Sequence, residues 1–124
     1  MLELTIKEKT YAFRFGMGFM REINKKSHTS VEGVSVDTGL QYAVADLFDE
    51  NPIGLVDILL AANKTEIPRV NRDLLDAYID DENTDVSGLC AEVLDFLKQS
   101  NATKKQAVAV LETIETELAK REQG

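Results

Sequence analysis

Signals for the start of a helix recur at short intervals beyond residue 37, and they limit the fold more than any other feature of the chain. Such a signal is an Asn, Asp or Thr whose side chain can accept a hydrogen bond from a free backbone amide of the first helical turn. Each one is followed by apolar residues at helical spacing. The signals are Thr38, Asn51, Asn71, Asp85 and Thr103. They predict a series of short helices over the rest of the chain.

Neighbouring residues sharpen several of these helix boundaries. Gln41 and Gln106 each stand three residues after a threonine, the pattern of a capping box, in which two side chains satisfy two backbone amides. Pro52 occupies a first helical position, where its missing amide hydrogen costs nothing. Val70 and Leu75 hold the two positions of a hydrophobic staple. The predicted helices cover residues 39–49, 52–62 and 72–80, with two more that start after residues 85 and 103.

Residues 2–15 alternate between apolar and polar side chains, the pattern of half-buried strands. The alternation is interrupted at residues 8–10, so the runs 2–6 and 11–15 predict a β-hairpin. Gly16 and Gly18 end the second run, and a short helix is expected to follow and to end near Lys26. Residues 27–37 are rich in Ser, Thr, Gly and Val without a sustained period, and are interpreted as a loop with room for a short extended piece.

These elements predict an α+β fold that is predominantly helical, with an N-terminal β-hairpin followed by about six short helices. The chain of 124 residues has the length of one compact domain, and its 44% of hydrophobic residues can form a core without a cofactor. Neither an internal repeat nor a linker divides it. Residues 1–124 are therefore expected to form a single domain.

The balance of charge argues against nucleic acids and membranes as partners. The net charge of −8 and the isoelectric point near 4.6 repel phosphate backbones and anionic lipids. The basic cluster of Arg21, Lys25 and Lys26 is small, and Glu22 is expected to pair with Lys26 one helical turn later. The most apolar stretch, residues 53–62, is too short to span a membrane.

Cysteine usage and the first residues predict a cytoplasmic protein. Cys90 is the single cysteine and lies in an apolar stretch, so neither an intramolecular disulfide nor a cysteine-based zinc site can form. The N-terminus has no basic segment followed by an apolar one, so no secretion signal is expected. Residues 63–65 and 101–103 match the glycosylation pattern, but without secretion they are interpreted as turn and cap chemistry.

One inter-helix segment resembles a calcium-binding loop. Its residues at loop positions 1, 3, 5, 7 and 12 are Asp81, Asn83, Asp85, Ser87 and Glu92. The sixth position requires glycine for a sharp turn, and Val86 stands there. Clusters of Asp and Asn also occur in ordinary loops that cap a helix, so the sequence favours a plain loop and no metal.

No other pattern predicts catalysis or a cofactor. Gly16 and Gly18 suggest a phosphate-binding loop, but Arg21 replaces the third glycine of the dinucleotide fingerprint, so a flexible strand-to-helix turn is the favoured interpretation. His28 is the single histidine and is expected in an exposed loop, with no nucleophile motif around it. An enzyme is therefore the least favoured class.

The final helix carries an apolar seam that is either core or interface. Its members step by four, three and four residues: Ala107, Leu111, Ile114 and Leu118. Such seams usually pack into the core of a small domain. Val108 and Val110 lie off the seam and widen the apolar surface, so a second stripe could meet a partner. The predicted partner-binding residues are Val110, Leu111, Ile114 and Leu118.

Several stretches resemble the tail assembly chaperone family of long-tailed phages that infect Gram-positive bacteria. They include Leu4-Thr5-Ile6 with residues 11–24 (YAFRFGMGFMREIN), and residues 92–105 (EVLDFLKQSNATKK). Asn51-Pro52, Pro68-Arg69-Val70 and Tyr78-Ile79-Asp80-Asp81 also fit the pattern. Each string is short, but together they extend over nearly the whole chain.

The resemblance implies a non-enzymatic protein that binds the aggregation-prone tape measure protein and helps tail tube subunits assemble around it. It further implies a homo-oligomer that works in the host cytoplasm and is absent from the mature virion. An acidic exterior would keep such a complex soluble, while apolar strips would cover the client. The alternative function is a permanent virion structural protein, such as a head-tail or tail component.

Overall fold

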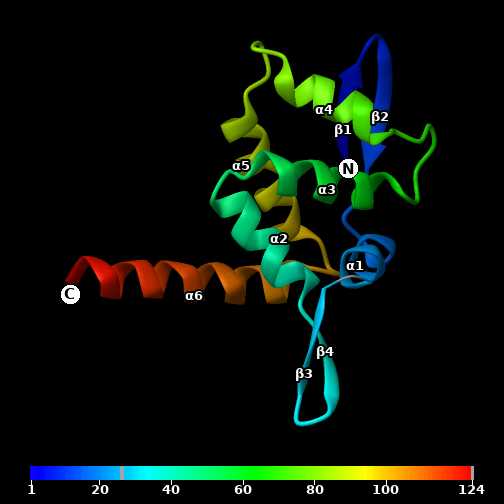
Figure 1. Ribbon diagram of the computed structural model, residues 1–124. Coiled ribbons are helices and arrows are strands. Elements are labelled where there is room, and N and C mark those ends of the chain that lie inside the picture. Colours follow the sequence, from blue (N-terminus) through cyan, green and yellow to red (C-terminus); the bar gives the residue numbers. More distant parts are fainter. Residues whose placement is uncertain (26, 124) are drawn as a thin grey trace.

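The computed structural model describes residues 1–25 and 27–123, which form two small β-hairpins and six helices (Figure 1). The elements are β1 (Leu2–Ile6), β2 (Lys9–Phe13), α1 (Met17–Asn24), β3 (His28–Val31), β4 (Val34–Asp37), α2 (Gly39–Phe48), α3 (Pro52–Asn63), α4 (Arg72–Asp80), α5 (Val86–Gln99) and α6 (Lys104–Gln123). This architecture confirms the predicted α+β, mostly helical fold.

The first hairpin packs against the helices through one of its two faces. Strands β1 and β2 are antiparallel, with Leu2 opposite Phe13, and every second residue of β1 is buried. The second strand ends at Phe13, two residues earlier than predicted. The reason is that the Arg14 amide leaves the hairpin and donates to the carbonyl oxygen of Ala62 in α3, at 2.8 Å.

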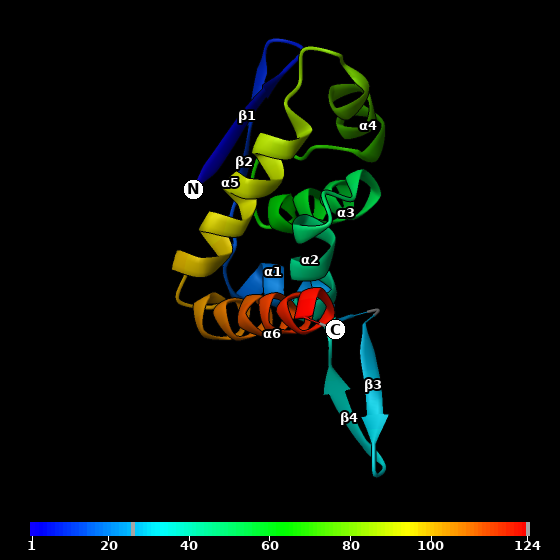
Figure 2. The ribbon, with the colours of Figure 1, turned by 90° about the vertical axis from the view of Figure 1, so that its left-hand side faces the viewer.

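Residues 27–37 were predicted to be a loop with room for a short extended piece, and this segment is more regular than predicted. They contain a second antiparallel hairpin, β3–β4, that projects from the helical body (Figures 1 and 2). Its turn consists of Glu32 and Gly33, whose φ angles are 51° and 82°. A two-residue hairpin turn of type I′ has positive φ at both central residues, and glycine adopts it without strain at the second position.

Three of the predicted helix caps are confirmed. The side chain of Asn51 accepts hydrogen bonds from the amides of Ile53 and Gly54 at the start of α3. The side chain of Asn71 accepts from Leu74 in α4. At α5 the carboxylate of Asp85 accepts from the amide of Gly88, at 2.9 Å.

The capping box predicted at Thr38 is wrong. Its side chain makes no capping hydrogen bond, and the first amide of α2, on Gly39, donates instead to Asn24 Oδ1 at 2.9 Å. This helix start lies so close to the end of α1 that a Cβ on Gly39 would be 2.4 Å from the Ile23 carbonyl oxygen. At Thr103 the hydroxyl points back and donates to the Leu97 carbonyl oxygen at 2.6 Å.

The other helix boundaries agree closely with the prediction. Residues 72–80 match α4, while α2 ends one residue early and α3 one residue late. Helix α1 ends at Asn24 rather than near Lys26, which lies outside the described residues, as does its expected ion pair with Glu22. Within the described residues Glu22 forms an ion pair with Lys25, with an Nζ to Oε2 distance of 3.0 Å.

Helix α3 is the centre of the core. It is buried along most of its length and packs against α1, α2, α4 and β2. At its C-terminal end Asn63 has no exposed surface, and its side-chain amide donates to the carbonyl oxygens of Ala12 and Pro68. Its Oδ1 accepts from the amide of Val70 at 2.7 Å. This one side chain therefore ties β2, α3 and the segment before α4 together.

Candidate protein-binding surfaces

Helix α6 is packed at one end and free at the other. It contacts α2 and α5 through its first turns, and its C-terminal half extends past the body (Figures 1 and 2). Along the predicted seam Ala107 is fully buried, Leu111 and Ile114 are half-buried against the core, and Leu118 is 39% exposed. The seam is thus core at its start and open to a partner at its end.

The two valines outside the seam also differ in their exposure to solvent. Val108 is 39% exposed, whereas Val110 is half-buried against the core. Among the four residues predicted to bind a partner, Leu118 is the most accessible, and the other three share their surface with the core. Sequence periodicity placed all four on one side of a helix, but the point where the body ends beneath that side depends on tertiary packing.

The β3–β4 hairpin presents a second apolar surface. Its register pairs Thr29 with Val36 and Val31 with Val34, so these four side chains lie on one face. The three valines are 55%, 64% and 40% exposed at positions 31, 34 and 36. The opposite face holds the polar residues His28, Ser30, Ser35 and Asp37. All eight strand residues are exposed, and sequence reasoning missed this surface.

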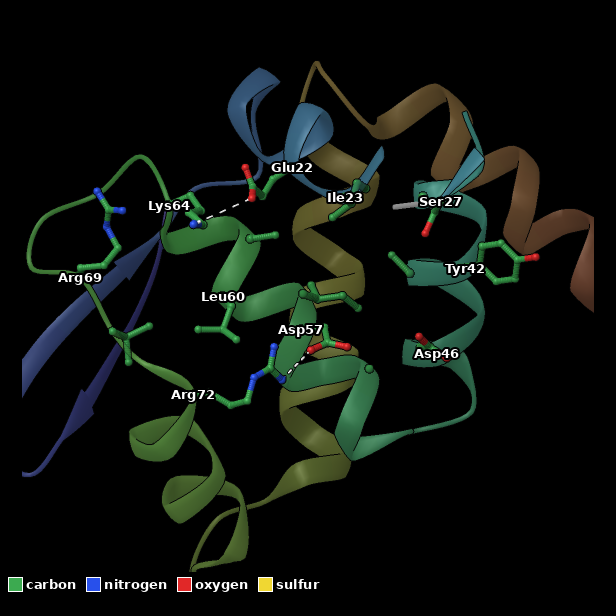
Figure 3. Close-up of a pocket in the computed structure, with 16 residues that line it drawn as sticks. Glu22, Ile23, Ser27, Tyr42, Asp46, Asp57, Leu60, Lys64, Arg69 and Arg72 are labelled. Atoms are coloured by element: carbon green, nitrogen blue, oxygen red, sulfur yellow. Dashed lines mark hydrogen bonds and ion pairs between the residues drawn. The ribbon is translucent and has the colours of Figure 1, made fainter. Parts of the chain in front are cut away.

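A groove of about 590 Å³ lies between α1, α2, α3 and the segment that leads to α4 (Figure 3). Its charged residues are largely paired with one another. Arg72 bonds Asp57 at 2.7 Å, and Lys64 lies 4.0 Å from Glu22. Asp46 accepts a hydrogen bond from the Asn51 side chain at 3.3 Å. These carboxylates hold neighbouring elements together. Such pairing is typical of a structural contact between elements and not of a reaction site.

The segment that resembles a calcium loop uses its polar groups internally. Asp81 accepts a hydrogen bond from the Asn83 amide, and Asp85 caps α5. The Ser87 hydroxyl donates to the Glu50 carboxylate. Within residues 1–25 and 27–123, no group of three or more His, Cys, Asp or Glu side chains is placed to hold a metal ion. The internal bonds favour the interpretation as a plain loop.

Two glycines and the histidine differ in detail from their predicted roles. Neither Gly16, with φ −113°, nor Gly18 has the positive φ that would require a flexible turn. Gly18 instead allows a close approach, since an added Cβ would lie 2.5 Å from Thr65 Cγ2. His28 is exposed as predicted, but it begins strand β3 and is not in a loop.

The surroundings of Cys90 make its thiol inaccessible to solvent and lower its reactivity. Cys90 belongs to α5, is buried in the core and is a free cysteine. Burial, and to a smaller extent the Glu50 carboxylate, raise the pKa of its thiol. The thiol therefore stays protonated at neutral pH, which disfavours a nucleophilic role. No helix in the described part of the chain is long and apolar enough to cross a membrane.

Projecting apolar surfaces on an acidic, mostly helical α+β body are typical of a protein that acts by binding other proteins. The family model for phage tail assembly chaperone protein, TAC, matches residues 3–112, so the chain belongs to this family. The match confirms the resemblance inferred from the sequence. Comparisons with curated proteins and with solved structures give no significant match. The family match ends within α6, so the projecting end of this helix lies beyond it.

Proposed function

We propose that this chain is a non-enzymatic chaperone that binds the tape measure protein and helps tail tube subunits assemble around it. It acts as one domain, residues 1–124, in the host cytoplasm and leaves before the virion is complete. The observation that carries the proposal is the family match over residues 3–112. The description of that family gives tail assembly as its role, and the tape measure protein is the client that the sequence resemblance implies.

The physical character of the molecule supports a transient holder. Its apolar side chains are accessible on projecting elements, where they can cover a client segment without rearrangement of the core. Its net charge of −8 keeps a loaded complex soluble by repulsion between complexes. These exposed apolar side chains and the acidic exterior together favour a reversible contact with the client over a permanent one.

We place the client contact on the α6 seam, at Val110, Leu111, Ile114 and Leu118. Helix-in-groove or helix-on-helix packing uses apolar residues at this spacing. Substitution of Leu111 or Ile114 would also damage the core, because both pack against it. Leu118 is exposed and belongs to the C-terminal half of α6, so it can be changed without loss of the fold.

A pull-down after co-expression with the tape measure protein tests this contact. Leu118→Asp should reduce capture of the client about tenfold or more, because burial of a leucine contributes about 1.5–3 kcal/mol and a buried unpaired carboxylate opposes binding. Thr116→Asp adds the same charge on the opposite side of α6 and should leave capture unchanged. Unaltered helical circular dichroism would show that both variants are folded.

Equal capture by the wild type and the Leu118→Asp variant would exclude the end of α6 as the client contact. Absence of capture by the wild-type chain itself would instead count against tape measure binding. The two results separate an error in the position of the site from an error in the function.

A further inference from the structure

The groove beside α3 has charges of opposite sign on its two sides (Figure 3). Lys64, Arg69 and Arg72 lie on the side of the segment that leads to α4, whereas Asp46 lies opposite them on α2. The chain as a whole has 22 acidic and 14 basic residues, so three basic side chains along one side are a local exception to its negative charge. The two sides of the groove therefore attract charges of opposite sign.

One charge on each side is without an ionic partner among the described residues. Arg69 is exposed, and its Nε donates to the backbone carbonyl oxygen of Glu66 at 3.3 Å. Asp46 is half-buried and accepts a hydrogen bond from the neutral side chain of Asn51 at 3.3 Å. Neither Arg69 nor Asp46 forms an ion pair within residues 1–25 and 27–123. These two charges can therefore still bind the charges of an occupant.

Apolar side chains lie between the two charged sides. Ile23 and Leu60 are half-buried against the core, so part of each remains accessible from the groove. Tyr42 is 64% exposed and lies one turn before Asp46 on α2. The groove has a volume of about 590 Å³, within the range of about 300–1,000 Å³ that is usual for binding pockets. It has room for the apolar side chains of a partner segment.

We propose that this groove binds a short amphipathic helix of another protein. The helix has an apolar stripe that contacts Leu60 and Tyr42, a carboxylate that faces Arg69 and a basic side chain that faces Asp46. A helix carries such side chains on the two flanks of its apolar stripe, because residues three and four apart share a face. Binding of the apolar face of a helix in a groove is a recurrent mode of protein recognition.

Charge complementarity favours this occupant over other classes of ligand. A nucleic acid or an anionic lipid surface carries one sign of charge, and it would face Asp46 on a chain whose net charge is −8. An extended strand presents every second side chain on one face, so its charges lie along the groove and not on both sides of it. A helix with charges of both signs beside an apolar stripe matches the groove better.

The groove is separate from the end of α6, which is the site proposed for the client. No described residue of α6 lines it. The inference therefore does not depend on binding of the tape measure protein, and one chain can hold a client through α6 and a second protein through the groove.

Isothermal titration calorimetry of the full chain with two synthetic peptides, at physiological salt, tests the proposal. Both peptides are alanine-rich with leucines at helical spacing and about 15 residues long, near the minimum length for an isolated helix. The mixed peptide has glutamates on one flank of the leucines and lysines on the other, and the lysine peptide has lysines on both flanks. The wild-type chain should bind the mixed peptide more tightly, because one row of lysines in the other peptide faces Arg69.

The Arg69→Glu variant makes both sides of the groove acidic. It should weaken binding of the mixed peptide about three- to tenfold, because a like-charge pair replaces an exposed ion pair, and it should reverse the preference in favour of the lysine peptide. The matched control Arg21→Glu makes the same change of charge on α1, where Arg21 is exposed and does not line the groove. This control should still prefer the mixed peptide. Circular dichroism should show that both variants are folded.

A wild-type chain that binds neither peptide at millimolar concentration would overturn the proposal. So would a wild-type chain that binds the lysine peptide at least as tightly as the mixed one. An equal change of preference in the Arg69→Glu and Arg21→Glu variants would also overturn it, because general attraction to an acidic chain would then explain the binding. Reversal by Arg69→Glu alone supports it. Client capture is measured separately, so failure of this inference leaves the proposed function untouched.

Discussion

Replacement of Asn63 by alanine should destabilise the protein more than any other single polar-to-alanine change near α3. The side chain has no exposed surface and makes three hydrogen bonds, at 2.9 Å to Ala12 O, 3.2 Å to Pro68 O and 2.7 Å from the Val70 amide. Each bond contributes about 1 kcal/mol net, and a buried amide left without a partner costs about 1–3 kcal/mol more. We expect a loss of roughly 3–5 kcal/mol in the free energy of unfolding.

Urea and thermal unfolding followed by circular dichroism measure this loss. Asn101→Ala is the matched control, because Asn101 is exposed in the turn before α6 and its replacement should change stability by less than about 0.5 kcal/mol. Asn63→Asp keeps an acceptor for Val70 but turns the donor toward two carbonyl oxygens into a carboxylate oxygen. It should be at least as destabilising at pH 7 and less so at acidic pH, where the carboxyl is protonated.

An Asn63→Ala variant within about 1 kcal/mol of the wild type would refute the reasoning. That result would mean that water replaces the side chain, or that β2 and the segment before α4 are held mainly by apolar packing. The hydrogen bonds of Asn63 would then be incidental to the fold.

Three further predictions follow from local geometry. Lys7 and Glu8 form the turn of the first hairpin with φ of 50° and 69°, so Lys7→Asn with Glu8→Gly should raise the free energy of unfolding by about 1 kcal/mol in urea titrations. Gly39→Ala should lower it by about 1–3 kcal/mol, because the new Cβ collides with the backbone of α1. The raised pKa of Cys90 should make its alkylation at pH 8 slow in the native protein and fast in urea. The same raised pKa means that the contribution of this thiol to stability is complete below its ordinary pKa of 9.0 and is lost at higher pH.

The sequence predicted a helix cap correctly where the capping side chain and the amide that it binds belong to the same helix start. The caps at Asn51, Asn71 and Asp85 involve amides two or three residues away, so their residue types and spacing were sufficient. The cap at Thr38 failed because the amide of Gly39 is satisfied by Asn24, a residue of another helix. Asn63 escaped notice for the same reason, since its partner Ala12 lies 51 residues away.

The sequence of residues 28–37 contains a signal for the second hairpin, which sustained periodicity alone does not detect. The run Thr29-Ser30-Val31 precedes Glu32-Gly33 and the run Val34-Ser35-Val36 follows it, so short stretches rich in β-branched residues flank a two-residue segment with glycine at its second position. Its strands are only four residues long and lie outside the core, so no sustained burial pattern marked them. The α6 seam was found from its spacing, but the division between its packed and open ends depends on where α2 and α5 stop.

The most direct test of a chaperone role is the amount of this chain in assembling and in finished phage particles. Quantitative mass spectrometry of gradient fractions would measure it relative to the tape measure protein. We predict that the chain co-migrates with the tape measure protein in assembly intermediates and is absent from purified virions. A fixed number of copies in every purified virion would contradict the chaperone role and identify the chain as a permanent structural component of the particle.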